Sequence, residues 1–308
     1  MINDLIHQED VLAVNRFPVS TAATFRSPVF LPWIKATDIM IRDYETQYRP
    51  WRKVEVIDRK GNQIESIEID KPLWRRHKNF LNALFSNIVP IPLENGGCLF
   101  VYSANWMATK LGYEQPNKRL QDVDQIASQI KRTTINYRLK NRPGVSEVNI
   151  FDKTTRITGD DVEKYGLPVE ASGMRSVIVS PDWIELIKSD QQVVMMPETA
   201  QTIAQIPDGA WQSIVEIALS HKDFFNQRLE TSKDGETIGA IELIGFKKAL
   251  MSKSAYSKQR KNLITQSESS DMAARLTGVV IEEGADGFVV RRIDQHNKVG
   301  HIYISDWT

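Results

Sequence analysis

The order of apolar segments between residues 70 and 151 constrains the fold of this chain more than any other feature of its sequence. Apolar residues recur at helical spacing over 73–88, where Asp70 is the expected N-cap, Pro72 occupies the first turn and Pro90 ends the helix. A helix with one apolar face must bury that face against other elements. We therefore expect this helix to lie at the centre of a packed unit.

A helix-turn-helix pattern follows this first helix. A short strand is expected at 99–102, and Ser103 then caps a helix at 104–111 that Gly112 stops. A second helix is expected over 117–131, because its apolar residues form a single stripe.

A two-stranded wing is expected after this pair of helices. The strand at 133–137 is rich in β-branched residues, and a turn at 142–144 separates it from a second strand at 145–151. Helix, short strand, helix, turn, helix and two-stranded wing is the order of a winged helix.

The residues before this unit predict an arm and a hairpin. Prolines interrupt the apolar clusters of residues 1–52, which we expect to form an irregular arm. Strands at 54–57 and 64–69 flank a Lys-Gly-Asn turn at 60–62, as in a β-hairpin. The polar, glycine-bearing segment 152–175 is the expected boundary between two domains.

The second half repeats the order of elements found in the first. Its expected segments are a strand at 176–179, helices at 197–206 and 209–225, a strand at 238–243, helices at 245–251 and 257–276, and strands at 278–282, 287–293 and 301–305. The predicted fold is α+β: two winged-helix domains in tandem, each with a helix-turn-helix and a β-wing, preceded by an N-terminal arm and hairpin. The predicted domains are the arm at 1–52, a first winged-helix domain at 53–155 and a second at 156–308.

Composition limits the kinds of partner that this chain can have. Its 39 basic residues balance 39 acidic ones, so a nucleic-acid site must come from local segregation of charge. The single cysteine, Cys98, excludes an internal disulfide and a multi-cysteine zinc site. No stretch approaches the ~18 apolar residues of a membrane span, and the first ten residues lack the apolar core of a signal peptide. We therefore expect a soluble, cytoplasmic protein without membrane contact.

Positive charge gathers at the second helix of the first helix-turn-helix. Seven Lys and Arg residues stand against two acidic residues between Pro116 and Arg142. The second helix of such a pair enters the major groove of DNA, where it needs donors for phosphates and base edges. The candidate DNA-binding residues of the first half are Asn117, Lys118, Arg119, Gln121, Lys131, Arg132 and Arg138.

The second half carries a sharper basic segment. Six Lys and Arg residues and no acidic residue lie between Phe246 and Lys261. The segment includes hydroxyl and amide side chains, which bind phosphates and read bases. The candidate DNA-binding residues of the second half are Lys253, Ser257, Lys258, Gln259, Arg260 and Lys261. Short basic runs also occur on ordinary solvated helix faces. In each half, however, the basic run lies at the second helix of the predicted helix-turn-helix, which is the helix expected to contact DNA.

The sequence lacks the motifs of phosphate-loop ATPases and of histidine-ligated metalloenzymes. It contains no Gly-x-x-x-x-Gly-Lys-Ser/Thr phosphate loop, and its five histidines never approach the spacing of metal ligands. The acidic pairs at 160–161 and 282–283 lie in the polar segment and in the second wing, where solvation explains them. We expect no catalytic residue, no metal site and no cofactor.

Several segments together resemble the iteron-binding plasmid replication initiators, which are double winged-helix proteins. The resemblance covers most of the chain from about Ala22 onward. Its segments are Phe25–Phe30 in the arm, the Gly-x-x-Ile hairpin leading to Trp74, Tyr102–Gly112 at the first helix-turn-helix, Val177–Pro181, Gln205–Trp211 and Ser257–Lys261 at the second recognition helix. The sequence departs from the family at Ser267–Asp271, which is a poor helix former inside the last long helix.

The resemblance implies a function in plasmid replication. It implies binding to directly repeated duplex sequences at an origin, opening of an adjacent AT-rich element, and recruitment of host proteins such as the replicative helicase. It also implies a monomer–dimer equilibrium in which one form, such as a homodimer, represses its own promoter or restrains copy number.

Two other readings of the same residues stay open. A transcriptional repressor could use the same two modules without melting its target DNA. A protein-interaction scaffold could expose its basic turns without contacting DNA, although such an interface is expected to present aromatic anchors that the sequence does not single out.

Overall fold

The computed structural model describes most of residues 17–216 and the backbone of selected strands beyond them. The described residues are 17–27, 29–54, 56, 63–209, 212, 213, 215 and 216, with the backbone of strands at 229–231, 237–242, 279–284, 287–293 and 302–305. The expected helices at 245–251 and 257–276 lie outside them, and so do the candidates Lys253 and Ser257–Lys261.

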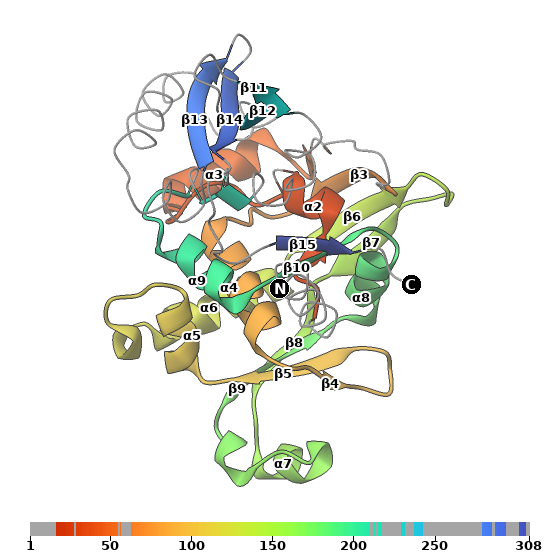
Figure 1. The fold of residues 1–308 in the computed structure, drawn as a ribbon. Coiled ribbons are helices and arrows are strands. Elements are labelled where there is room, and N and C mark those ends of the chain that lie inside the picture. Colours follow the sequence, from red (N-terminus) through yellow and green to blue (C-terminus); the bar gives the residue numbers. More distant parts are fainter. Residues whose placement is uncertain are drawn as a thin grey trace, which may run out of the picture.

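The described elements alternate short strands with helices (Figure 1). The helices are α2 (Ala22–Arg26), α3 (Asp38–Gln47), α4 (Arg75–Asn87), α5 (Ala104–Lys110), α6 (Leu120–Lys131), α7 (Gly159–Tyr165), α8 (Pro181–Lys188) and α9 (Pro197–Gln205), with 3₁₀ turns η1 (Pro116–Lys118) and η2 (Val169–Ala171). The strands are β1 (Ser20–Thr21), β2 (Arg52–Val54), β3 (Ile64–Ile69), β4 (Ile91–Pro92), β5 (Cys98–Tyr102), β6 (Thr134–Leu139), β7 (Ser146–Asn149), β8 (Phe151–Arg156), β9 (Arg175–Val179), β10 (Gln192–Met195), β11 (Leu229–Thr231), β12 (Thr237–Glu242), β13 (Val279–Gly284), β14 (Gly287–Ile293) and β15 (Ile302–Ser305). Among the described helices, none combines the length and the apolar character needed to cross a membrane.

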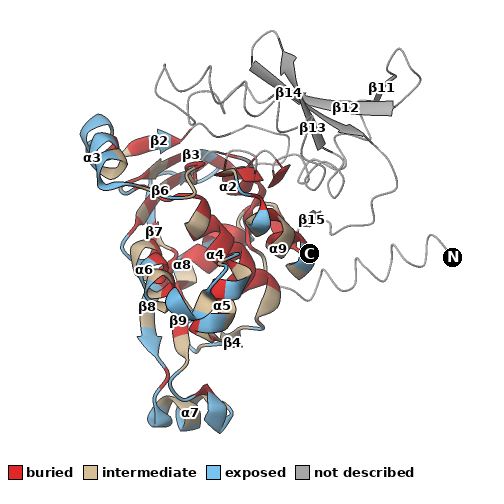
Figure 2. Ribbon diagram, turned by 90° about the vertical axis from the view of Figure 1, so that its left-hand side faces the viewer, coloured by how far each residue is buried: buried red, intermediate tan, exposed pale blue. Residues whose placement is uncertain are grey.

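The strands form several small antiparallel sheets, so the fold is α+β as the sequence predicts. Two four-stranded sheets have the orders β2-β3-β6-β7 and β4-β5-β9-β8, and α4 lies between them (Figures 1 and 2). A three-stranded sheet has the order β1-β10-β15, and a further four-stranded sheet has the order β11-β12-β14-β13.

The predicted hairpins pair as expected. Arg52 of β2 stands opposite Ile69 of β3, which confirms an antiparallel strand pair after the arm, although β2 covers Arg52–Val54 and not the predicted 54–57. Tyr137 of β6 stands opposite Ser146 of β7, which confirms the wing of the first half. Gly144 in the turn of the wing has a φ of 97°, a backbone conformation that L residues with side chains rarely adopt.

Helix α4 forms the centre of the core (Figure 2). Phe80 is fully buried, and its ring meets Tyr102 and Phe151 at centroid distances of 5.5 and 6.2 Å. Phe85 meets Phe100 in the same way, at 5.2 Å. Burial of one such side chain contributes about 1.5–3 kcal/mol to stability, so the aromatic face of α4 fixes this helix to the sheet β4-β5-β9-β8.

The start of α4 differs from the prediction. The helix begins at Arg75, and Asp70 is not its N-cap, because the Asp70 carboxylate accepts a hydrogen bond of 2.7 Å from the backbone N–H of Thr134. The Leu73 carbonyl accepts a bond of 2.7 Å from Leu31 N–H in the arm. The residues before α4 therefore pair with neighbouring backbone and do not enter the helix.

The arm is ordered by a small core of its own, which the sequence did not predict. Leu31, Tyr44 of α3 and Trp74 are buried together, and Trp33 meets the Tyr44 ring edge-on at 6.5 Å. In α3 only Tyr44 is buried. The helix therefore lacks the apolar stripe by which an amphipathic helix is predicted from sequence. This core fixes residues 31–48 against the start of α4.

The polar segment 152–175 is not the free linker that its composition predicts. Its first residues form β8, which pairs with β9 from Arg156↔Arg175 to Phe151↔Val179. β9 also pairs with β5, so both strands extend the sheet under α4. The rest of the segment carries α7, which projects at the end of this strand pair (Figure 1). The division of the chain at residue 155 stays a prediction.

The described parts of the second half confirm several predicted elements. α9, β12, β13, β14 and β15 lie close to their expected positions, whereas β10 was not predicted. β15 pairs with β10, with Ile304 opposite Val193. Residues 209, 212, 213, 215 and 216 are helical, in agreement with the predicted start of a helix at 209.

A buried charge network joins α4 to this helix start. Arg75 donates to Glu216 through two bonds of 2.6 and 2.9 Å, and Lys78 Nζ lies 2.8 Å from the same carboxylate. Glu216 is fully buried, and the two cations hold its pKa down at about 2 against the effect of burial. Gln212 Oε1 accepts from both Arg75 and Asn79, which completes the network.

Candidate nucleic-acid interface

The turn between α5 and α6 is fixed by its sequence. The Ser103 hydroxyl caps α5 by accepting from Trp106 N–H, and Gly112 ends the helix with a φ of 74°. A Cβ at Gly112 would lie 3.2 Å from the Ala204 carbonyl oxygen of α9. Glycine is therefore required here both by conformation and by the close approach of another helix.

Helix α6 buries one face and exposes another. Val123, Ile126 and Ile130 are buried on the side that meets α4, α5 and β8. Gln121 and Gln125 are exposed and lie one turn apart. Glutamine can bind the adenine edge in the major groove through two hydrogen bonds, so this face offers groups that can read bases.

The two acidic residues of α6 are both paired. Arg175 of β9 binds Asp124 through two hydrogen bonds of 3.0 Å. Arg119 Nη1 lies 3.3 Å from Asp122, and the Arg119 guanidinium lies 5.8 Å from the centre of the Tyr113 ring. Arg119 thus has partners within the protein, but its side chain remains 53% exposed, and its contact with DNA stays a prediction.

The C-terminal end of α6 is tied to the wing and exposes two cations. Lys71 Nζ donates to the Arg132 carbonyl at 2.7 Å, and the Asn149 amide donates to the Lys131 carbonyl at 3.2 Å. The side chains of Lys131 and Arg132 are exposed, and so is Arg138 on β6. At the other end of α6, η1 exposes the candidates Asn117 and Lys118, which precede the exposed Gln121.

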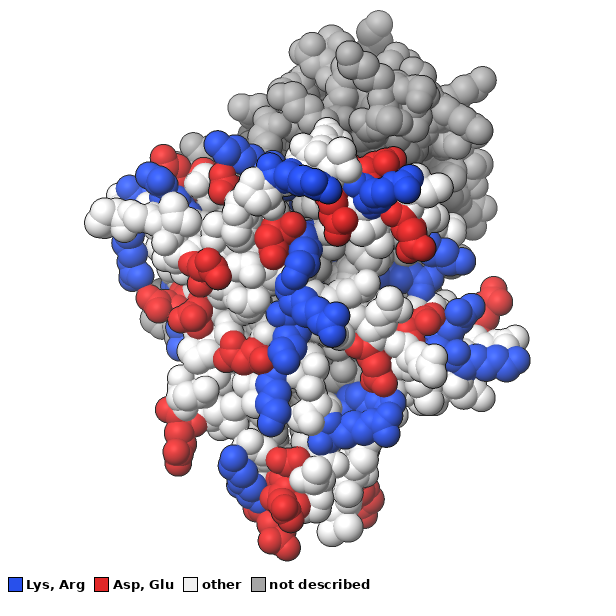
Figure 3. Space-filling model, turned by 180° about the vertical axis from the view of Figure 1, so that it is seen from behind, with Lys and Arg blue, Asp and Glu red and all other residues white. Residues whose placement is uncertain are grey.

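Positive side chains gather on the side of the molecule where α6 lies. Figure 2 has α6, β7 and β8 at its left edge, which is the side that Figure 3 shows. In Figure 3 a band of Lys and Arg side chains runs down this side, with Asp and Glu side chains along its edges. This face therefore carries both kinds of charge, with Lys and Arg side chains along its middle.

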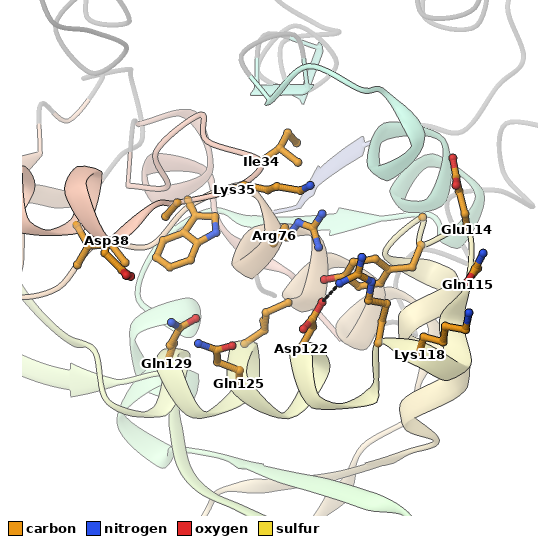
Figure 4. Close-up of a pocket in the computed structure, with 17 residues that line it drawn as sticks. Ile34, Lys35, Asp38, Arg76, Glu114, Gln115, Lys118, Asp122, Gln125 and Gln129 are labelled. Carbon is orange, nitrogen blue, oxygen red and sulfur yellow. Dashed lines mark hydrogen bonds and ion pairs between the residues drawn. The ribbon is translucent and has the colours of Figure 1, made fainter.

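A groove of about 990 Å³ runs between α6 and the arm (Figure 4). One wall consists of residues of η1 and α6, including Lys118, Gln125 and Gln129. The opposite wall consists of the arm, with Lys35 and Asp38, and the start of α4. The sequence does not predict this groove, because nothing in the residues of the arm indicates that it packs beside α6.

His77 of α4 sets the orientation of Gln129 at the base of this groove. Trp74 N–H donates to His77 Nδ1 at 3.0 Å, so the neutral ring carries its proton on Nε2. His77 Nε2 lies 3.0 Å from Gln129 Oε1 and donates to it. Complete burial lowers the pKa of His77 to about 4, which keeps the ring neutral at pH 7.

Three polar residues that line this groove were not among the candidate DNA-binding residues predicted from the sequence. Gln125 could have been found, because it follows Gln121 by one helical turn. Arg76 follows the fully buried Arg75, and nothing in the sequence distinguishes the two. Lys35 gave no signal, since its position depends on the core around Trp74. Among the described residues no group of three His, Cys, Asp or Glu side chains could hold a metal ion.

The described arrangement is a pair of helices joined by a turn and followed by a two-stranded wing, in a mixed α+β fold. No protein-family model and no curated protein sequence matches this chain. Two crystal structures are distantly similar to it. One contains domains 2 and 3 of RctB in selenomethionine form, with 11% identity, a TM-score of 0.43, and coverage of 94% of this chain and 99% of that chain. The other contains RctB domains 2–3, with 12% identity, a TM-score of 0.42, and coverage of 79% and 90%.

Proposed function

We propose that this chain binds double-stranded DNA sequence-specifically and initiates replication at direct repeats of a plasmid origin. The observation that carries the proposal is the exposed face of α6. On it, Gln121 and Gln125 lie between cations at both ends of the helix, with Lys118 at one end and Lys131 and Arg132 at the other.

The dimensions of α6 suit the major groove. Its 12 residues span about 18 Å, and the groove, about 12 Å wide, admits an α-helix. In the docked complex, Asn117 and Lys118 meet phosphates at the N-terminal end and the two glutamines face base edges. Arg138 on the wing meets the backbone beyond Arg132.

A second module is proposed to follow the same plan. The β13–β14 hairpin, with Val280 opposite Arg291, is suited to serve as its wing. The basic candidates Lys253, Ser257, Lys258, Gln259, Arg260 and Lys261 would then occupy its helix-turn-helix. Two such modules in tandem would contact successive major grooves on one face of the duplex.

The role in replication initiation rests on the resemblance of the sequence segments to iteron-binding initiators. With it come the proposed partners: directly repeated duplex DNA, a host replicative helicase and a second copy of this chain in a homodimer. In this proposal the protein acts by binding alone in the cytoplasm, without a catalytic residue, a metal or another cofactor.

Selection of duplexes from a random pool, followed by footprinting on a supercoiled plasmid, tests the proposal. We expect the selected sites to share a motif, and permanganate to detect unpaired thymines beside repeated copies of it. A shared motif without melting would make the protein a transcriptional repressor. Failure to select any duplex would contradict DNA binding and favour a protein-interaction scaffold.

A further inference from the structure

The groove beside α6 gathers hydrogen-bond donors at its centre (Figure 4). The Arg76 guanidinium stands there, held 4.5 Å above the ring of Tyr113. Lys35 reaches toward it from the arm. Within the described ranges, neither Arg76 nor Lys35 forms an ion pair with a carboxylate, so both charges can serve an external anion.

Gln129 adds a neutral donor from the opposite wall. Its carbonyl oxygen is occupied by His77, so the other half of the amide, the NH₂ group, is left for the groove that Gln129 lines. Figure 4 shows Gln129 toward the Asp38 end, away from Arg76 and Lys35, so these donors are spread along the groove. A ligand that satisfies the ammonium and the guanidinium at the centre must be rich in acceptors. A phosphate is such a ligand.

The carboxylates of the groove leave this centre open to an anion. Asp122 is paired with Arg119, and Figure 4 shows Asp38 and Glu114 toward opposite ends of the groove. Since the lining is polar and of mixed charge, it differs from the largely apolar pockets that enclose small molecules. A linear polyanion that passes the centre fits it better.

The groove also has the right position relative to the recognition face. Gln125 both lines the groove and is exposed on the outer side of α6. A helix in the major groove has a sugar–phosphate strand along each side. We propose that the groove holds the sugar–phosphate strand that flanks α6, with one phosphate bound by Arg76 and Lys35 and with Gln129 donating to the same strand farther along the groove. The proposal rests on the proposed docking of α6 and extends that interface to the arm.

The salt dependence of binding tests this contact in the full chain. The probe is a duplex of random sequence and about three helical turns, followed by fluorescence anisotropy between about 50 and 200 mM NaCl. The double variant Lys35→Gln/Arg76→Gln should lower the slope of log K against log salt by about 0.9, the value for one phosphate. Gln129→Glu keeps the acceptor for His77 but puts a negative charge in the groove, and should weaken binding by roughly fivefold.

Matched controls separate this contact from a general loss of charge. Lys53→Gln/Lys164→Gln removes two exposed cations elsewhere and should leave the slope unchanged. Gln47→Glu adds one negative charge on α3 and should leave the affinity unchanged. Arg76→Lys keeps the charge and should keep the slope. Thermal unfolding checks each variant, and because Lys35 is exposed, Lys35→Gln alone tests the groove if the Arg76 variants do not fold.

The outcomes distinguish this proposal from the proposed function. If Lys35→Gln/Arg76→Gln keeps the full slope while Lys131→Gln/Arg132→Gln lowers it, the groove does not hold a phosphate but α6 still binds DNA. An equal effect of the Lys53/Lys164 controls also overturns the groove contact. If the unaltered chain binds duplex without salt dependence, both proposals fail.

Discussion

Arg175 binds Asp124 through two hydrogen bonds of 3.0 Å, so that strand β9 neutralises an acidic residue on the helix proposed to enter DNA. The contact joins residues 51 positions apart and depends on the sheet that carries β9 beside α6. An unpaired carboxylate at this position would repel the phosphates on either side of the helix.

Replacing Arg175 by Met should therefore weaken duplex binding more than it weakens the fold. The pair is partly exposed, so its loss should cost at most about 1 kcal/mol of stability. Adding Asp124→Asn should restore the affinity, because no charge is then left unpaired. A double-mutant cycle of dissociation constants measures the coupling, and additive effects would contradict this explanation.

The exposed glutamines of α6 should determine base preference. Gln125→Ala should cost about 1–3 kcal/mol of binding to a selected site and relax the preference at one position. Lys131→Ala should weaken binding to selected and random duplexes alike, as expected of a phosphate contact. Competition between selected and random duplexes measures the affinity of each variant for both. An equal loss of affinity for the two duplexes in Gln125→Ala would show that Gln125 contacts the DNA backbone instead of a base.

Gly112→Ala should destabilise the chain by about 1–3 kcal/mol, since it forces a left-handed φ on alanine and crowds the Ala204 carbonyl. Gly144→Ala in the turn of the wing is the matched control, because its φ is also positive but nothing lies within 4 Å of the added Cβ. Urea unfolding of both variants separates the conformational cost from the crowding. Equal losses of unfolding free energy in the two variants would show that α9 shifts enough to accommodate the added methyl group.

The buried carboxylate of Glu216 should be worth far more than any surface carboxylate. Glu216→Gln leaves Arg75 and Lys78 buried without a counter-charge, and should cost about 3–5 kcal/mol. Glu185→Gln breaks the exposed pair with Arg142 and should cost less than about 1 kcal/mol. Denaturant unfolding compares the two variants through their midpoints, provided that their m-values are equal. Similar losses of unfolding free energy would contradict a stabilising role of the buried charge network.

Stability should fall as the pH drops below about 6.5, before the carboxylates titrate. His77 has a pKa of about 4 in the folded chain against 6.5 in the unfolded chain, so below pH 6.5 only the unfolded chain gains this proton. The loss should grow to roughly 3 kcal/mol near pH 4. His77→Asn should flatten the decline between pH 6.5 and 5, as measured by urea unfolding at each pH.

Local signals predicted the elements around α6 well. Ser103, Gly112 and the stripe through Val123 and Ile130 act within a few residues of one another, so their pattern is visible in the sequence. The same holds for the wing, whose turn at Gly144 requires a positive φ.

Contacts between distant segments escaped prediction. Segment 152–175 looks like a linker because its polar residues face outward on β8, and its pairing with β9 leaves no mark in its composition. Asp70 resembles a helix cap, but the backbone of Thr134, 64 residues away, competes for its carboxylate. The groove depends on the arm and α6 together, and neither segment predicts it alone.

The larger of the two cores of the described residues runs from Val19 to Val215, and it affects how this protein can be divided for experiments. A fragment ending at residue 155 would lack β9, which leaves one edge of β5 without its neighbour, and would also lack Glu216, the partner of Arg75. Such a fragment should aggregate when expressed. Truncation studies of the first winged helix should therefore retain residues 17–216 as one piece.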